Sequence, residues 1–329
     1  MSIVKKTLLK GGSLAGTYLI ETGKEKFVRK QISTRDNREY GYQRWYSQMK
    51  RIQRYNQLFP GLFPDILRCG YDDNCAFFDL EFLETAVNCH DYISKTQTNS
   101  EIDKVFSKII AAMNRMHSKQ MTSSPESIDL YIQEEIRQKI DDALVDEKFK
   151  KFFDYDYVVF KGKDIEGLSK ALDSYIKFGK KNYKVPVECF THGNITLENI
   201  MYCPVKEIIY FIDPYDENII DSVCNEYSQL LQSCNSHYEI YNSSDVKIDE
   251  NKVITDIEIP PGIKYFNILF SEFLERNLSE QQMQLVSFFE ISQFVRMLPF
   301  KMHVDKEKMI LFYALASNLF SSIKEKYNL

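Results

Sequence analysis

The chain has 329 residues, of which 44% are apolar and 27% charged, and its formal net charge is −5. This is enough apolar chain to bury a large core and to form two domains or two lobes, which excludes a small stapled module. The acidic balance gives no general reason to expect nucleic acid as a partner. We interpret the two basic runs, residues 26–38 and 49–54, as solvated surface.

The cysteines and the apolar runs indicate in which cellular compartment the protein is expected. The seven cysteines are scattered without CxxC or CxxxH spacing and their number is odd, so neither a disulfide framework nor a zinc site is indicated. The basic N-terminal segment is interrupted by Gly11-Gly12-Ser13, and no stretch approaches the ~18 apolar residues of a membrane span. We expect a cytoplasmic protein without a membrane span.

The first part of the chain predicts a β-rich lobe over residues 1–84. Short strands are expected at 3–9, 16–22 and 25–32, forming an antiparallel meander. A long helical pattern over 38–59 ends at Pro60-Gly61, and strand-like runs at 65–71 and 75–83 flank a polar turn at 72–74. The prediction is five strands and one helix.

The remainder, residues 85–329, predicts a mostly helical lobe. Apolar residues recur at three- and four-residue spacing on one face of a helix that ends near residue 118: Ile102, Val105, Phe106, Ile109, Met113 and Met116. Further helical patterns cover about 128–150, 165–181, 282–298 and 307–323. A strand-loop-strand segment around 191–213 forms a small β insert, so the expected fold class is α+β with two lobes.

That insert carries a recognisable spacing of polar residues. His192-Gly193-Asn194 is followed by Asn199 and, after two short apolar strands, by Ile212-Asp213-Pro214. The segment resembles the HGDxxxxN…IDP signature of the aminoglycoside phosphotransferase and choline kinase family, relatives of the protein kinases. The resemblance implies a two-lobed protein-kinase-like fold that binds ATP or GTP with Mg²⁺ and transfers phosphate to a hydroxyl of a small molecule.

The same resemblance assigns roles within the segment. It implies that Asn199 and Asp213 ligate the metal and that His192 braces the loop. The family has a catalytic Asp where this chain has Asn194, and an amide has no basic lone pair at neutral pH. Either an active enzyme carries an Asp-to-Asn substitution, or the natural chain is a weakened, binding-only member. We favour substitution, because Asn199 and Asp213 are both retained.

Two regions of the first lobe are expected to contact the nucleotide phosphates. Gly12 and Ser13 lie in a flexible loop between two strands that suits a cover over phosphates. Lys30 shares a strand face with Val28, which resembles the kinase lysine that binds the α- and β-phosphates, whereas a one-residue register slip would place Arg29 there instead.

Two further assignments complete the expected nucleotide site. Glu39, in the long helix, is the expected ion-pair partner of Lys30. Residues 81–83, including Glu81 and Leu83, resemble the hinge whose backbone pairs with the base.

The acceptor is defined least by the sequence. Aromatic-rich segments 149–160 and 290–301 are expected either to wall an acceptor pocket or to belong to the core. Resemblance of residues 212–221 and 296–301 to chains of bacterial surface-polysaccharide biosynthesis favours a sugar or polyol over an aminoglycoside or choline. The alternatives are a nucleotide-binding pseudokinase that acts through partners, and a helical binding protein whose kinase-like segment is coincidental. The sequence predicts no oligomeric state.

Overall fold

The computed structural model describes residues 3–9, 16–35, 38–96, 98–121, 124, 126–184, 188–215 and 218–329. The chain forms two compact units. The first comprises Met1–Tyr92, Lys108–Met116 and His192–Glu217, and the second comprises Ile93–Ser107, His117–Thr191 and Asn218–Leu329. Each unit combines segments that are far apart in the sequence, whereas the two lobes expected from the sequence have a single boundary, after residue 84. That lobe boundary remains a prediction.

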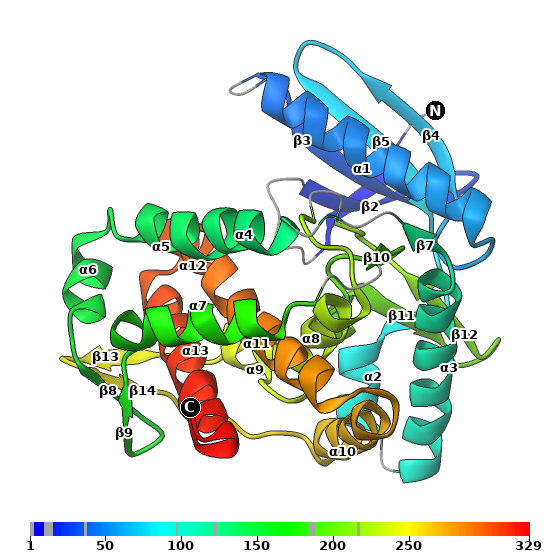
Figure 1. Ribbon diagram of the computed structural model, residues 1–329. Coiled ribbons are helices and arrows are strands. Elements are labelled where there is room, and N and C mark those ends of the chain that lie inside the picture. Colours follow the sequence, from blue (N-terminus) through cyan, green and yellow to red (C-terminus); the bar gives the residue numbers. More distant parts are fainter. Residues whose placement is uncertain are drawn as a thin grey trace. The chain divides into compact units, whose positions relative to one another are not determined.

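A five-stranded antiparallel sheet dominates the first unit, in the order β1-β2-β3-β5-β4 (Figure 1). Its strands are β1 (Ile3–Leu8), β2 (Gly16–Thr22), β3 (Lys26–Ser33), β4 (Ile66–Tyr71) and β5 (Cys75–Glu81). Helix α1 (Arg38–Leu58) packs against β3 and β5. This sheet and the helical remainder confirm the predicted α+β class.

Alternation of side chains along the strands explains where α1 packs. Apolar residues at every second strand position meet apolar residues at three- and four-residue spacing on the helix. The resulting core contains Ile32, Trp45, Met49, Ile52, Ala76 and Phe78. Gly41 lets the helix approach closely, since a Cβ there would lie 2.6 Å from the backbone oxygen of Ser33.

The opposite face of the sheet carries a buried carboxylate between two arginines. Asp79 is fully buried and accepts hydrogen bonds from Arg29 Nε at 2.7 Å and from Arg68 Nε at 2.6 Å. The guanidinium groups lie over aromatic rings, Arg29 over Phe77 and Arg68 over Phe27. These stacked side chains shield the buried charge and the aromatic rings from water.

The first unit also contains a three-stranded sheet in the order β12-β11-β6. Its strands are β6 (Val87–Asn88), β11 (Ile200–Cys203) and β12 (Ile208–Phe211), and the short 3₁₀ helix η2 (Leu197–Asn199) leads into β11. Two helices run from one unit into the other along the chain: α2 (Cys89–Lys95) and α3 (Asn99–His117).

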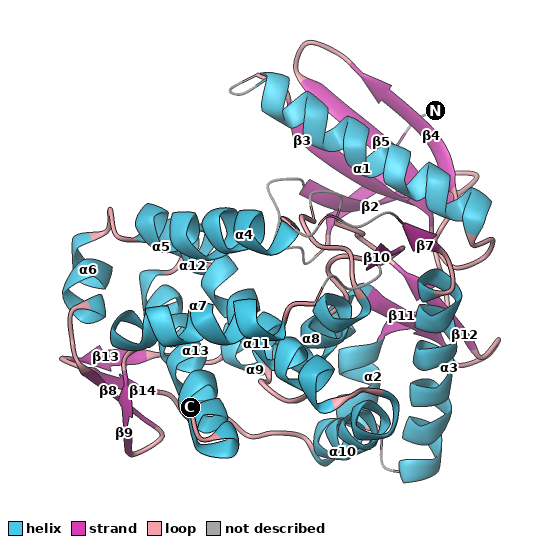
Figure 2. Cartoon of the chain, viewed as in Figure 1, coloured by secondary structure: helices cyan, strands magenta, loops and turns pink. Residues whose placement is uncertain are grey.

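Helices make up most of the second unit (Figure 2). They are α4 (Ser127–Tyr131), the π-helix η1 (Ile132–Arg137), α5 (Gln138–Ala143), α6 (Glu147–Phe153), α7 (Leu168–Asn182), α8 (Val223–Cys234), α9 (Tyr238–Ser243), α10 (Pro261–Asn277), α11 (Glu280–Arg296), α12 (Leu298–Val304) and α13 (Lys306–Tyr327). Helix α11 is central, because it packs against α5, α7, α8, α12 and α13. No helix of the described residues is long and apolar enough to cross a membrane.

The second unit corrects two of the predicted helices. The helix expected at 165–181 begins only at Leu168, because the preceding residues form strand β9 (Lys163–Glu166). The pattern at 128–150 is interrupted after Ala143, and a new helix starts at Glu147 with Asp146 as its N-cap. An Asx side chain that accepts a backbone N–H in this way starts a helix.

The sequence analysis did not predict the four-stranded sheet of order β13-β14-β8-β9. Its remaining strands are β8 (Tyr157–Phe160), β13 (Lys247–Asp249) and β14 (Lys252–Ile254), and the unit also has the two-residue pair β7 (Gln120–Met121) and β10 (Glu188–Cys189). The pairing of β14 with β8 joins segments far apart in the sequence. Strands this short show little periodicity of their own.

Candidate functional site

The β11–β12 hairpin places two of the predicted metal ligands at one of its ends. Ile200 pairs with Phe211, and one step further the amide of Ile212 donates to the carbonyl of Asn199 at 3.0 Å. Asn199 therefore precedes the first strand of the hairpin and Asp213 follows the second, so both residues lie at the same end. The local reason is the short turn at 204–207, which folds the two apolar strands back on each other.

His192 braces the loop that precedes this hairpin. Its fully buried ring donates through Nε2 to the carbonyl of Ile212 at 2.8 Å and accepts at Nδ1 from the amide of Asn194 at 3.3 Å. The ring stacks on Phe63 and meets Phe211 edge-on. Burial lowers the pKa of His192 to about 4, so at neutral pH the ring is the uncharged Nε2–H tautomer that these two bonds require.

The turn after His192 orients the two asparagines. Gly193 has a φ of 81°, a conformation that favours glycine. The carbonyl of Asn194 accepts from the amide of Thr196 at 3.0 Å and from Nδ2 of Asn199 at 2.8 Å, while the Asn194 side chain is exposed. Because Nδ2 of Asn199 is the donor in this bond, its Oδ1 is the end that remains to coordinate a cation.

Asp213 follows β12 in the left-handed conformation, with a φ of 57°. Its Oδ1 accepts from Lys30 Nζ and, at 2.5 Å, from Nε2 of Gln48. Burial opposes the charged form, but the charge of Lys30 and the hydrogen bonds from Lys30 and Gln48 outweigh it and lower the pKa of Asp213 below its usual value. The carboxylate is therefore ionised and held at one of its oxygens.

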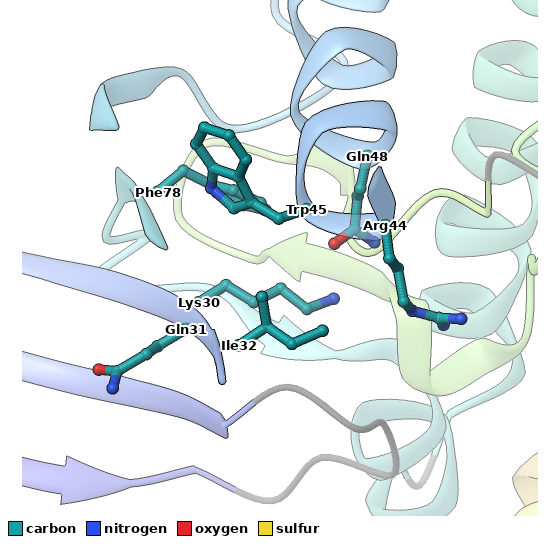
Figure 3. Close-up of a pocket in the computed structure, with 7 residues that line it drawn as sticks. All are labelled: Lys30, Gln31, Ile32, Arg44, Trp45, Gln48 and Phe78. Atoms are coloured by element: carbon teal, nitrogen blue, oxygen red, sulfur yellow. The ribbon is translucent and has the colours of Figure 1, made fainter. Parts of the chain in front are cut away.

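The strand register separates the two candidate cations of β3. Lys30 pairs in β3 with Thr17 and Phe78 and lines a small pocket together with Gln48 and Arg44 of α1 (Figure 3). Arg29 lies on the other face with Asp79. Lys30 is thus the cation brought to Asp213, and its role toward phosphate remains a prediction.

Gln48 is a site residue that the sequence analysis missed. It lies on α1 three residues after Trp45 and four before Ile52, so it falls on the buried face of the helix. A polar residue that interrupts an apolar stripe at this spacing was the available signal. Its partner, 165 positions away, was not readable from the helix alone.

Some predicted site residues are not located by the structure. Gly12 and Ser13 lie outside the described residues. Glu39 belongs to α1, but its side chain is also outside the described part, so its predicted pairing with Lys30 stays a prediction.

Two backbone groups of the expected hinge, residues 81–83, already form hydrogen bonds within the protein. The amide of Glu81 donates to the carbonyl of Asp65 at 2.9 Å, and the carbonyl of Leu83 accepts from the amide of Ala86 at 3.0 Å. Backbone groups committed in this way are less available to a base, so contacts to it are expected from the Leu83 amide rather than from the Glu81 amide. The hinge role itself stays a prediction.

The donor set at the end of the hairpin suits Mg²⁺. One carboxylate and one amide oxygen are typical of sites where Mg²⁺ retains waters and binds substrate phosphates. Among the described residues no group of three or more His, Cys, Asp or Glu side chains could hold a metal by itself. Asn199 and Asp213 therefore fit a metal that arrives with a nucleotide.

Comparison with known proteins gives a likeness in structure but none in sequence. No protein-family model and no curated protein matches the chain. Among solved structures, a point mutant of aminoglycoside 2'-phosphotransferase IIIa in complex with GDP matches with a TM-score of 0.61 at 12% identity, covering 100% of this chain and 95% of the other.

Two more solved structures match over nearly their full lengths. A candidate fructosamine-3-kinase from Haemophilus somnus 129PT has a TM-score of 0.57 at 12% identity, and the match covers 97% of this chain and 92% of the other. A spectinomycin phosphotransferase in complex with ADP and spectinomycin has a TM-score of 0.53 at 13% identity, and the match covers 98% of this chain and 94% of the other. The chain therefore has the two-lobed, protein-kinase-like fold of these proteins, as the sequence predicted.

Proposed function

We propose that this chain is a small-molecule kinase that binds ATP or GTP with Mg²⁺ and phosphorylates a hydroxyl. The observation that carries the proposal is the meeting of Lys30, Gln48 and Asp213 at the end of the hairpin that also holds Asn199. The fold is shared with phosphotransferases that include GDP and ADP complexes, which supports nucleotide binding.

Phosphoryl transfer asks the protein mainly for charge neutralisation and alignment. Lys30 supplies a positive charge for the α- and β-phosphates. Asn199 and Asp213 would hold the ion through one amide oxygen and one carboxylate. When bound, Mg²⁺ offsets the charge of the phosphate oxygens and lowers the barrier to displacement. His192 keeps the loop and the residue before Asp213 in register.

Asn194 limits the chemistry that this chain can perform. Its amide can orient an acceptor hydroxyl but cannot take its proton. His192 does not replace the missing base, since it is fully buried and both ring nitrogens are engaged. We propose that Asn194 stands at the position of the catalytic base and that transfer by this chain is slowed by ~10²–10⁴, the usual worth of a general base.

The proposed acceptor is a sugar or polyol hydroxyl, and the proposed setting is bacterial surface-polysaccharide biosynthesis. Its support is the resemblance of residues 212–221 and 296–301, together with the neighbour whose name refers to fructosamine. Phe149, Phe152 and Phe160 of segment 149–160 do not add to this support, since they are buried in the core. A cytoplasmic location fits the seven cysteines, all of which are free.

A pseudokinase is the second candidate, and Asn194 is the observation that favours it. Thermal shift with ATP and GTP, each with Mg²⁺, tests nucleotide binding for both candidates. A variant with Lys30→Met should lose most of the stabilisation. The control Lys26→Met, on the same strand with a half-exposed side chain, should retain it. Failure of both nucleotides to stabilise the wild-type chain would refute both candidates.

Restoring the base divides the two candidates. The variant Asn194→Asp should release ADP at least 100-fold faster than the chain with Asn194 when one member of a panel of sugars, polyols, amino alcohols and aminoglycosides is present. The active acceptor then identifies the substrate class. Background ADP release by Asn194→Asp across the whole panel, with nucleotide binding intact, would favour the pseudokinase.

A further inference from the structure

Gln48 is the residue of α1 that reaches the proposed metal ligand. Its Nε2 donates to Oδ1 of Asp213 at 2.5 Å and to the carbonyl of Pro214 at 3.2 Å. Both acceptors are oxygens, so the side-chain nitrogen must point toward them. One amide therefore bridges a side chain and the backbone of the next residue.

These contacts divide the two carboxylate oxygens of Asp213 into separate roles. Oδ1 accepts from both Lys30 and Gln48. Both side-chain hydrogen bonds that Asp213 accepts from the described residues end on Oδ1, which leaves Oδ2 for a cation. The left-handed backbone of Asp213, with φ of 57°, is a conformation that persists when its surroundings hold it, and Gln48 holds it at two points.

The neutral amide matters as much as its position. A carboxylate at residue 48 would bring a second negative charge to hydrogen-bond distance of Asp213 and would compete with it for Lys30. A glutamine contributes only a donor to the same oxygen. Asp213 thus keeps its full charge for the metal while its orientation is fixed.

We propose that Gln48 is a positioning residue for the metal: its amide holds Oδ1 of Asp213 so that Oδ2 faces Mg²⁺. The inference rests on the proposed function, because it requires a nucleotide-bound Mg²⁺. It extends that function by adding α1 to the groups that determine metal affinity. Second-layer partners of this kind typically change metal affinity by about 10- to 100-fold.

The test is calorimetric titration with ADP, first in EDTA and then in Mg²⁺. The quantity of interest is the gain in ADP affinity that Mg²⁺ produces. Gln48→Met keeps the length of the side chain without the donor, and Gln48→Asn keeps an amide that is too short to reach. In both variants the gain in ADP affinity that Mg²⁺ produces should be about 10- to 100-fold smaller than in the wild-type chain. Their ADP affinity in EDTA should stay within about threefold of the wild-type value. Gln57→Met, on an exposed position of the same helix, is the matched control and should behave as the wild-type chain.

Three outcomes would overturn the inference. The first is an unchanged Mg²⁺ gain in Gln48→Met and Gln48→Asn. The second is a fall of ADP affinity in EDTA and in Mg²⁺ by the same factor, together with a lower melting temperature without ligand, which would mean that Gln48 only stabilises the fold. The third is a wild-type chain whose ADP affinity does not depend on Mg²⁺. A wild-type chain that binds neither ADP nor GDP would instead refute the proposed function.

Discussion

Replacing His192 by Phe is expected to destabilise the first unit by an amount that depends on pH. At pH 7 a phenyl ring can keep the stack between Phe63 and Phe211, but it removes the partners of the Ile212 carbonyl and the Asn194 amide. Each buried group left without a partner costs about 1–3 kcal/mol. The expected loss at pH 7 is therefore roughly 2–6 kcal/mol.

Acidification should reduce this difference. The pKa of His192 is about 4 in the folded chain and 6.5 in the unfolded chain. Between these values the unfolded chain binds the additional proton, so the stability contributed by His192 is complete above pH 6.5 and is lost as the pH falls to 4. The 2.5-unit interval corresponds to about 3 kcal/mol at 1.36 kcal/mol per unit. Phe cannot titrate and shows no such loss.

The measurement is urea unfolding followed by the fluorescence of Trp45, the single tryptophan, which is buried in the first unit. Other carboxyl groups titrate in the same range, but they cancel in the difference between the wild-type chain and His192→Phe. That difference should shrink by about 3 kcal/mol between pH 7 and pH 4. A difference that stays constant would refute the argument that His192 is buried in its neutral form.

The other predictions concern buried groups outside the loop. Asp79→Asn should lower the unfolding free energy by about 3 kcal/mol, because two arginines lose their shared carboxylate, whereas Glu25→Gln at a partly exposed ion pair should cost less than about 1 kcal/mol; equal losses in urea unfolding would contradict this. Burial raises the pKa of Glu290, so the melting temperature of the wild-type chain relative to that of Glu290→Gln should fall as the pH rises from 4.5; parallel pH profiles would disprove it. Gly262→Ala places a Cβ 2.1 Å from a backbone oxygen of α2 and should lower the unfolding free energy by about 1–3 kcal/mol or more, as measured by urea unfolding. Gly23→Ala, whose Cβ would have no atom within 4 Å, should lower it far less.

Local patterns in the sequence were enough for the fold class and for much of the first unit. Alternation over 25–32 and the helical pattern over 38–59 predict the strand and the helix that the structure contains at 26–33 and 38–58, and they place Lys30 on the face opposite to Arg29. The spacing of His192, Asn199 and Asp213 predicts a hairpin that returns on itself. Such signals are readable because strand and helix periods depend on neighbouring residues only.

Periodicity failed where structure depends on distant partners. The four-stranded sheet of the second unit joins β8 and β14, whose own residues are too few to show a pattern. The apparent helix at 165 begins in a strand for the same reason, since pairing with β8 outweighs its local helical spacing. In short segments, tertiary contacts decide between helix and strand.

The sequence by itself determined which residue types were available for the proposed chemistry: a lysine in the third strand, an Asn and an Asp flanking a hairpin, and an amide at position 194. Only the tertiary structure decided that Gln48 joins them and that His192 is neutral. The physical reason is that hydrogen bonds and burial are set by groups far away in the chain, so the partner and the protonation state of a polar side chain appear only after the chain has folded.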